Sequence, residues 1–151
     1  MKLRNSIRFT LAALTAGSLL WCGNEGKAAE LNTVDPTGTW KIATINPETK
    51  SKVSEAPMKL KREGGKLTGT ITHQSTVNGE TRVLERVLKE TKLQGDDISF
   101  TVSIPPVTGT GPEATKTYRG KITGDTMKGK VETEWNGSTF RRDWEAKRVK
   151  E

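Results

Sequence analysis

The chain has 151 residues with one cysteine and one histidine; 32% of the residues are hydrophobic, and the formal net charge is +7. The low apolar content excludes a bundle of membrane-spanning helices, each of which would need about 20 apolar residues in a row. A single cysteine excludes a disulfide framework, and one Cys with one His leaves no conventional zinc cluster. The length suits one domain.

The first thirty residues have the order of a secretory signal peptide. A basic segment precedes an apolar run over 9–21, and a polar stretch with the small residues Gly26 and Ala28 follows. We therefore expect a signal-peptide helix over 1–28, a lead-in over 29–37, and one exported domain over 38–149, periplasmic or extracellular. An uncleaved N-terminal anchor is the alternative.

Cys22 stands where the cysteine of a bacterial lipoprotein would stand, but Trp21 fits poorly at the preceding position, which favours a small residue. We therefore favour loss of Cys22 with the leader over a lipid anchor. Four basic residues and Glu25 precede residue 30, so their removal lowers the net charge from +7 to +4. Without a dense basic run interleaved with aromatic residues, the sequence predicts no nucleic-acid partner, and it predicts no membrane span in the mature form.

Alternation of apolar and polar residues predicts β-strands along most of the remaining chain. In one example, Ile98, Phe100 and Val102 alternate with Ser99 and Thr101. Turn pairs such as Asn-Gly and Gly-Asp separate the segments and favour short hairpins. The pattern predicts eight strands, over 38–45, 56–62, 66–76, 80–93, 97–104, 115–123, 126–135 and 138–148.

Consecutive hairpins predict an up-and-down meander, and closure of the meander would remove its exposed edges. The expected fold is therefore an all-β, eight-stranded antiparallel up-and-down barrel, with a two-sheet sandwich as the alternative. Thr81–Leu93 also carries apolar residues at helical spacing, so it is a helix or a bulged strand; the hairpin turn before it favours the strand. Ile104–Ala114, rich in Pro and Gly, is either a long connection or a lid over one barrel mouth.

Gly38 and Trp40 open the first strand, and the last strand, 140–148, is basic. In these features the chain resembles the calycins, the superfamily of lipocalin-like and avidin-like barrels. The resemblance implies that the indole closes the barrel floor and that Arg142 or Arg148 packs across it. It also implies a small-molecule ligand inside the barrel. The second and third lipocalin motifs and the biotin-binding polar cluster of avidins are not evident, so biotin binding is not inferred.

Aromatic residues with a few polar neighbours alternate onto the faces expected to point inward, and they form either the core or the lining of a small pocket. Phe140 is expected to point inward with them. The candidate ligand-binding residues are Trp40, His73, Phe100, Tyr118, Trp135, Arg142 and Trp144. For Trp40 and His73, a structural role is the favoured alternative.

The sequence predicts no catalytic residue, cofactor or metal site. It contains no Gly-x-Ser-x-Gly elbow, and His73 has no cysteine nucleophile to activate. We therefore expect a secreted, non-enzymatic barrel that binds a small apolar or amphipathic ligand. The alternatives are a protein-interaction or protease-inhibitor-like module acting through Glu30–Thr37, and a structural accessory domain of the cell envelope.

Overall fold

The computed structural model describes residues 34–77, 79–106 and 110–150. The expected signal peptide, Cys22 and the first part of the lead-in lie outside these residues. Within the described ranges, no helix has the length and hydropathy needed to cross a membrane. All of the regular structure described is β-strand.

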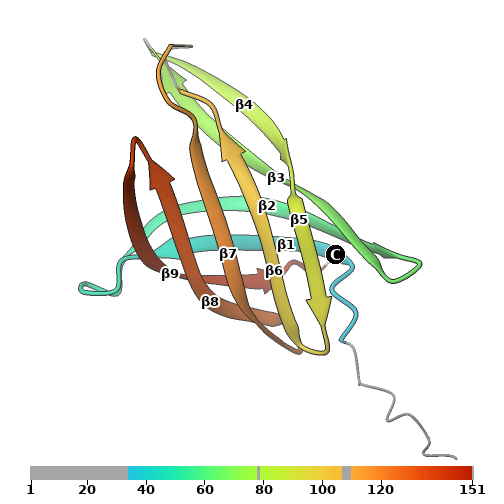
Figure 1. The fold of residues 1–151 in the computed structure, drawn as a ribbon. Coiled ribbons are helices and arrows are strands. Elements are labelled where there is room, and N and C mark those ends of the chain that lie inside the picture. The colour runs from blue at the N-terminus through green and yellow to red at the C-terminus, as the bar shows by residue number, and fades with distance from the viewer. Residues whose placement is uncertain (1–33, 78, 107–109, 151) are drawn as a thin grey trace, which may run out of the picture.

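Nine antiparallel strands form one curled sheet (Figure 1). Their order across the sheet is β4-β3-β2-β1-β9-β8-β7-β6-β5, so the first strand pairs with the last and the remaining neighbours are hairpins. The strands are β1 (Gly38–Ile45), β2 (Lys52–Glu63), β3 (Lys66–Val77), β4 (Glu80–Val87), β5 (Lys89–Gln94), β6 (Asp97–Ile104), β7 (Ala114–Thr123), β8 (Thr126–Trp135) and β9 (Ser138–Arg148).

The expected all-β meander is confirmed, and four of the expected strands have the predicted bounds. The expected closed barrel of eight strands is wrong: the sheet has nine strands and two unpaired edges, β4 and β5. The sandwich is also wrong, because all nine strands belong to a single sheet. The middle of the Pro- and Gly-rich connection, 107–109, lies outside the described residues, so the lid remains a prediction.

The ninth strand arises because the segment expected over 80–93 breaks at Leu88. There the Leu88 N–H donates to the Gly69 carbonyl at 2.9 Å, and Glu90 adopts a positive φ of 48°. The Thr91 hydroxyl then donates to the Leu67 carbonyl, and the β5–β6 register shifts. The segment is therefore extended, as expected, but it leaves the edge of β3 to join β6. No ladder of hydrogen bonds joins β4 to β6, so the sheet is not closed between these two strands.

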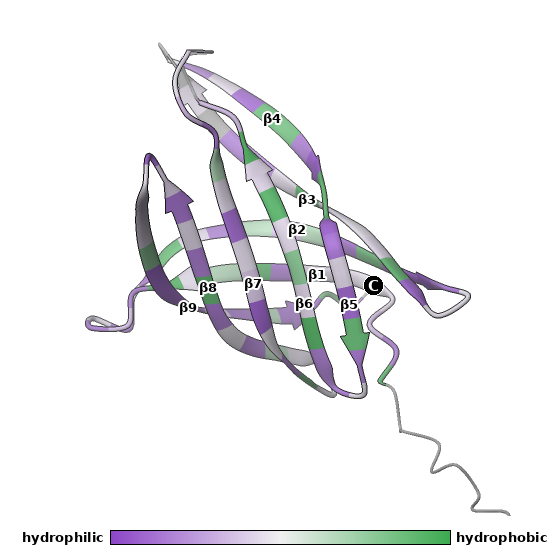
Figure 2. Ribbon diagram, viewed as in Figure 1, coloured by the Kyte–Doolittle hydropathy of each residue, from purple (hydrophilic) through white to green (hydrophobic). Residues whose placement is uncertain are grey.

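The inward faces of the strands supply a continuous apolar core. The buried cluster runs from Trp40, Met58 and Leu60 through Phe100 and Trp144. Apolar and polar residues alternate along β6 in Figure 2, and the apolar Ile98, Phe100 and Val102 are buried. Half-buried strands with one polar face are the usual arrangement of antiparallel sheets.

The end of the sheet where β1 begins and β9 ends is densely packed, and we call it the closed end. Trp40 is fully buried, and its Nε1–H donates to the Pro36 carbonyl at 2.8 Å. The Arg148 guanidinium lies 4.3 Å from the centre of the Trp40 ring and also donates to the Asp35 and Thr37 carbonyls. Residues 34–37 of the lead-in are therefore anchored at this end.

Two glycines allow the strands near the closed end to pack closely. A Cβ on Gly129 would overlap the Arg119 carbonyl oxygen of β7. A Cβ on Gly120 would overlap the Lys128 backbone and lie 2.8 Å from the Trp144 ring. The indole of Trp144 therefore packs directly over backbone that no other residue type could offer.

Candidate functional site

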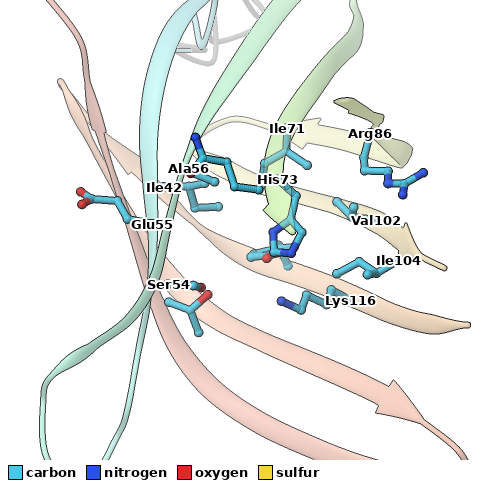
Figure 3. A pocket seen from close by; sticks show the side chains of 13 residues that line it. Ile42, Ser54, Glu55, Ala56, Ile71, His73, Arg86, Val102, Ile104 and Lys116 are labelled. Atoms are coloured by element: carbon cyan, nitrogen blue, oxygen red, sulfur yellow. The ribbon is translucent and has the colours of Figure 1, made fainter. Parts of the chain in front are cut away.

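The opposite end of the sheet, where β1 ends at Ile45, contains a cavity of about 250 Å³ between the inward faces; we call this the open end. Six strands line it (Figure 3). The lining side chains are Ile42 and Thr44 of β1, Ser54, Glu55 and Ala56 of β2, Ile71, His73 and Gln74 of β3, Arg86 of β4, Val102 and Ile104 of β6, and Lys116 and Tyr118 of β7.

An aromatic cluster separates this cavity from the closed end. Phe100 stacks on Tyr118 with ring centres 4.8 Å apart, and Trp144 meets both rings edge-on. The Trp144 Nε1–H donates to the Arg119 carbonyl at 3.1 Å. Burial raises the pKa of Tyr118 to about 12, although a hydrogen bond with Thr44 opposes the rise. Tyr118 is therefore a neutral phenol at physiological pH, and it belongs to both the cluster and the cavity wall.

The floor of the cavity is apolar and its rim is polar. Ile42, Ile71 and Val102 are buried around the floor. His73 lies between Arg86 and Lys116 in Figure 3, and Ser54 lies across the cavity. An apolar chamber with a few polar groups converging on it is the usual design of a small-molecule site.

Several basic side chains lie close together at the rim, and each makes it less favourable for its neighbours to carry a positive charge. Burial lowers the pKa of His73, and the neighbouring Lys116 and Arg86 lower it further. Burial likewise lowers the pKa of Lys116, with a further contribution from Arg142. Glu55, the one acidic residue of the lining, points away on the other side of β2 (Figure 3) and forms ion pairs with Lys41 at 3.2 Å and Lys52 at 3.5 Å.

The structure divides the predicted site residues among the cavity, the core and the solvent-exposed surface. His73 and Tyr118 line the cavity, and Arg142 lies close enough to Lys116 to affect its pKa. The remaining buried ones belong to the core, away from the cavity lining: Trp40, Phe100 and Trp144. Of the two arginines expected over the Trp40 indole, Arg148 occupies that position.

The expectation that Trp135 and Phe140 are buried inside the sheet is wrong. Their exposed fractions are 50% and 51%. The reason is the length of the β8–β9 hairpin. Pairing of β9 with β1 stops at Asp143, and pairing of β8 with β7 stops at Glu134. Beyond these points the hairpin has no neighbouring strand to cover its inner face.

Sequence reasoning missed Lys116 and Arg86. Both occupy inward positions by period-two spacing, Lys116 two residues before Tyr118 and Arg86 two residues before Leu88. The signal that could have identified them is a charged residue at a position of the strand where the alternation predicts an apolar, inward-facing one. Most of the Lys and Arg residues in the predicted strands alternate onto the outer face, which obscures this signal.

The outer surface has a larger hollow, of about 810 Å³, over Gly120 and Gly129. It is rimmed by Lys121, Lys128 and Lys130. No group of three or more His, Cys, Asp or Glu side chains in the described ranges is placed to hold a metal ion. The interior cavity is therefore the stronger candidate site.

Comparisons with known proteins add no relative to this description. No protein-family model, no curated protein and no solved structure gives a significant match to the chain.

Proposed function

We propose that this protein is an exported, non-enzymatic binding protein that takes a small amphipathic molecule into the open-end cavity. The observation that carries the proposal is the combination of an apolar floor, formed by Ile42, Ile71 and Val102, with a polar rim. A volume of about 250 Å³ corresponds to about eight waters at their share of the liquid. It therefore suits a short alkyl chain rather than a drug-sized ligand.

The calycin resemblance supports the same proposal. The Gly38–Trp40 opening of β1 and the stacking of Arg148 on Trp40 are the features the resemblance required. The meander and the pairing of the first strand with the last fit a calycin-like relation. We propose the relation on these features, with the break at Leu88 as this chain's departure from a closed barrel.

A titration of the purified domain with eight-carbon amphiphiles tests the function. Binding of 1-octanol or octanoate, followed by calorimetry and by backbone amide NMR shifts, is the expected result. Ala56→Leu, which adds volume to the cavity wall, should weaken binding at least tenfold. Lys59→Leu adds the same side chain to the exposed face of the same strand and should leave binding unchanged.

The result that would contradict the proposal is that neither amphiphile binds, or that Ala56→Leu binds as well as the parent protein. Circular dichroism and thermal unfolding of both variants establish that they keep the fold, so that lost binding reports on the cavity.

A further inference from the structure

We infer that the molecule bound in the cavity carries a carboxylate head group and that Lys116 and Arg86 hold it from opposite sides of the cavity mouth. This inference rests on the proposed function and adds the charge of the ligand. It comes from the charged side chains around the cavity, where basic side chains point inward and the one acidic side chain, Glu55, points away.

The cross-strand neighbours of these cations offer no negative charge. Lys116 is paired with Val102 on β6 and Thr133 on β8. Arg86 is paired with Ile71 on β3. Arg142, which contributes to the same field, is paired with Val131 on β8. Residues directly opposite each other on one face are the closest side-chain neighbours in a sheet, so the ladder itself provides no counter-charge.

Several cations on the outer face have acidic partners. Lys121 forms ion pairs with Asp96 at 3.4 Å and with Asp97 at 3.3 Å, and Arg141 pairs with Glu132 at 2.8 Å. Throughout the described ranges, no ion pair or side-chain hydrogen bond involves Lys116, Arg86 or Arg142. Lys116 and Arg86 are thus half-buried at the cavity and have no acidic partner, whereas Lys121 and Arg141 are exposed and paired.

Leaving a cation in a partly desolvated site is unfavourable unless something compensates for the lost hydration. A ligand carboxylate would do so, because charge-assisted hydrogen bonds from ammonium and guanidinium groups to carboxylates are short and strong. The lowered pKa values of His73 and Lys116 have the same origin and would rise toward their ordinary values when an anion binds.

The apolar side of the cavity fixes the orientation of the ligand. Ile42, Ile71 and Val102 would contact the alkyl chain, while the head group stays at the rim beside His73. The hydroxyls of Thr44 and Ser54 lie on the wall formed by β1 and β2 and can donate hydrogen bonds to the carboxylate. Aspartate and glutamate are missing from the inner face among the residues that line this space, apart from the outward-pointing Glu55.

The test compares octanoate with 1-octanol, which shares the chain length and lacks the charge, at pH 7 and low salt. Octanoate should bind at least tenfold more tightly, equivalent to about 1.4 kcal/mol. Lys116→Met should reduce this preference, taken as the ratio of the two dissociation constants measured for the same variant, at least fivefold, and Arg86→Met should do the same. Lys128→Met, on the exposed face of β8, is the matched control and should preserve the preference.

Equal or tighter binding of 1-octanol would overturn this inference and leave the proposed function standing. A preference for octanoate that survives in both Lys116→Met and Arg86→Met would also overturn it, because the head group would then lie elsewhere. Failure of both amphiphiles to bind would overturn the proposed function and the inference together.

Discussion

The two ends of the curled sheet use arginine in opposite ways. At the closed end, Arg148 stacks on Trp40, donates to two backbone carbonyls of the lead-in and pairs with Asp125 at 3.0 Å. At the open end, Arg86 and Arg142 lie near a hollow interior with no acid opposite them. The contacts of Arg148 stabilise the closed end, whereas under the proposed function the open end gives up stability for a binding cavity.

The largest expected effect is the loss of the buried indole at the closed end. Trp40→Ala should lower the free energy of unfolding by about 3–5 kcal/mol, because a fully buried Trp leaves a cavity that the sheet cannot fill. Ile104→Ala, at the half-buried margin of the open end, should cost less than about 2 kcal/mol. Urea denaturation of both variants measures the difference, and equal losses would contradict the division into two ends.

The two inward arginines of β9 offer a closely matched comparison. Arg148→Met removes the cation from the Trp40 ring and leaves the Asp35 and Thr37 carbonyls without their donor, so we expect a loss of about 2–3 kcal/mol. Arg142→Met, six residues earlier on the same face, should cost less than about 0.5 kcal/mol. Chemical denaturation of the pair settles the comparison, and a costlier Arg142 substitution would contradict it.

At Lys116 the expected change has the opposite sign. Lys116→Met removes an unpaired, partly desolvated ammonium while keeping the length of the side chain, so the free energy of unfolding should rise by about 1 kcal/mol. Lys128→Met should change it by less than about 0.5 kcal/mol. Thermal unfolding at pH 7 without ligand is the measurement. Destabilisation by Lys116→Met would show that the lysine has a structural partner.

The smallest expected effect is a pH dependence from the single histidine. Burial and the nearby Lys116 and Arg86 lower the pKa of His73 below 6.5, so the unfolded chain binds the proton more readily than the folded one. Stability should therefore decline as pH falls through about 6.5, with the loss complete below the folded-state pKa. The carboxyls of Glu55 and Asp35, whose pKa values lie below 4.5 and 3.8, titrate at lower pH.

His73→Gln should remove the decline between pH 7 and pH 5, because no other histidine titrates there. Thermal unfolding of the variant and its parent across this range gives the comparison. Identical pH profiles would mean that His73 is as hydrated in the folded chain as in the unfolded one.

The strands could be predicted from sequence because alternation and turn residues are local signals. Ile98, Phe100 and Val102 define β6 by themselves, and Asn136-Gly137 defines the β8–β9 turn. Closure could not be predicted in the same way, since it depends on a contact between segments distant along the chain. The break between β4 and β5 also depends on such contacts: the Leu88 N–H donates to the Gly69 carbonyl, the Thr91 hydroxyl donates to the Leu67 carbonyl, and Glu90 between them adopts a positive φ.

The candidate site was predicted only in part, because some of its features depend on local sequence and others on contacts between distant segments. The inward phase of His73 and Tyr118 is local, and both line the cavity. Whether an inward aromatic fills the core, lines a space or emerges into solvent depends on where neighbouring strands end. Trp144 is covered by β1 and β8, whereas Trp135 extends past the last β7–β8 pair, and the alternation of β8 and β9 is the same at both positions.

Amide NMR mapping with octanoate tests the central claim, that the open end binds and the closed end supports, most directly. We expect the largest shifts for the strand segments around Ile42, His73, Val102 and Lys116, with those at Trp40, Arg148 and Asp125 nearly unchanged. Shifts centred on the closed end or on the outer lysines around Gly120 and Gly129 would contradict it.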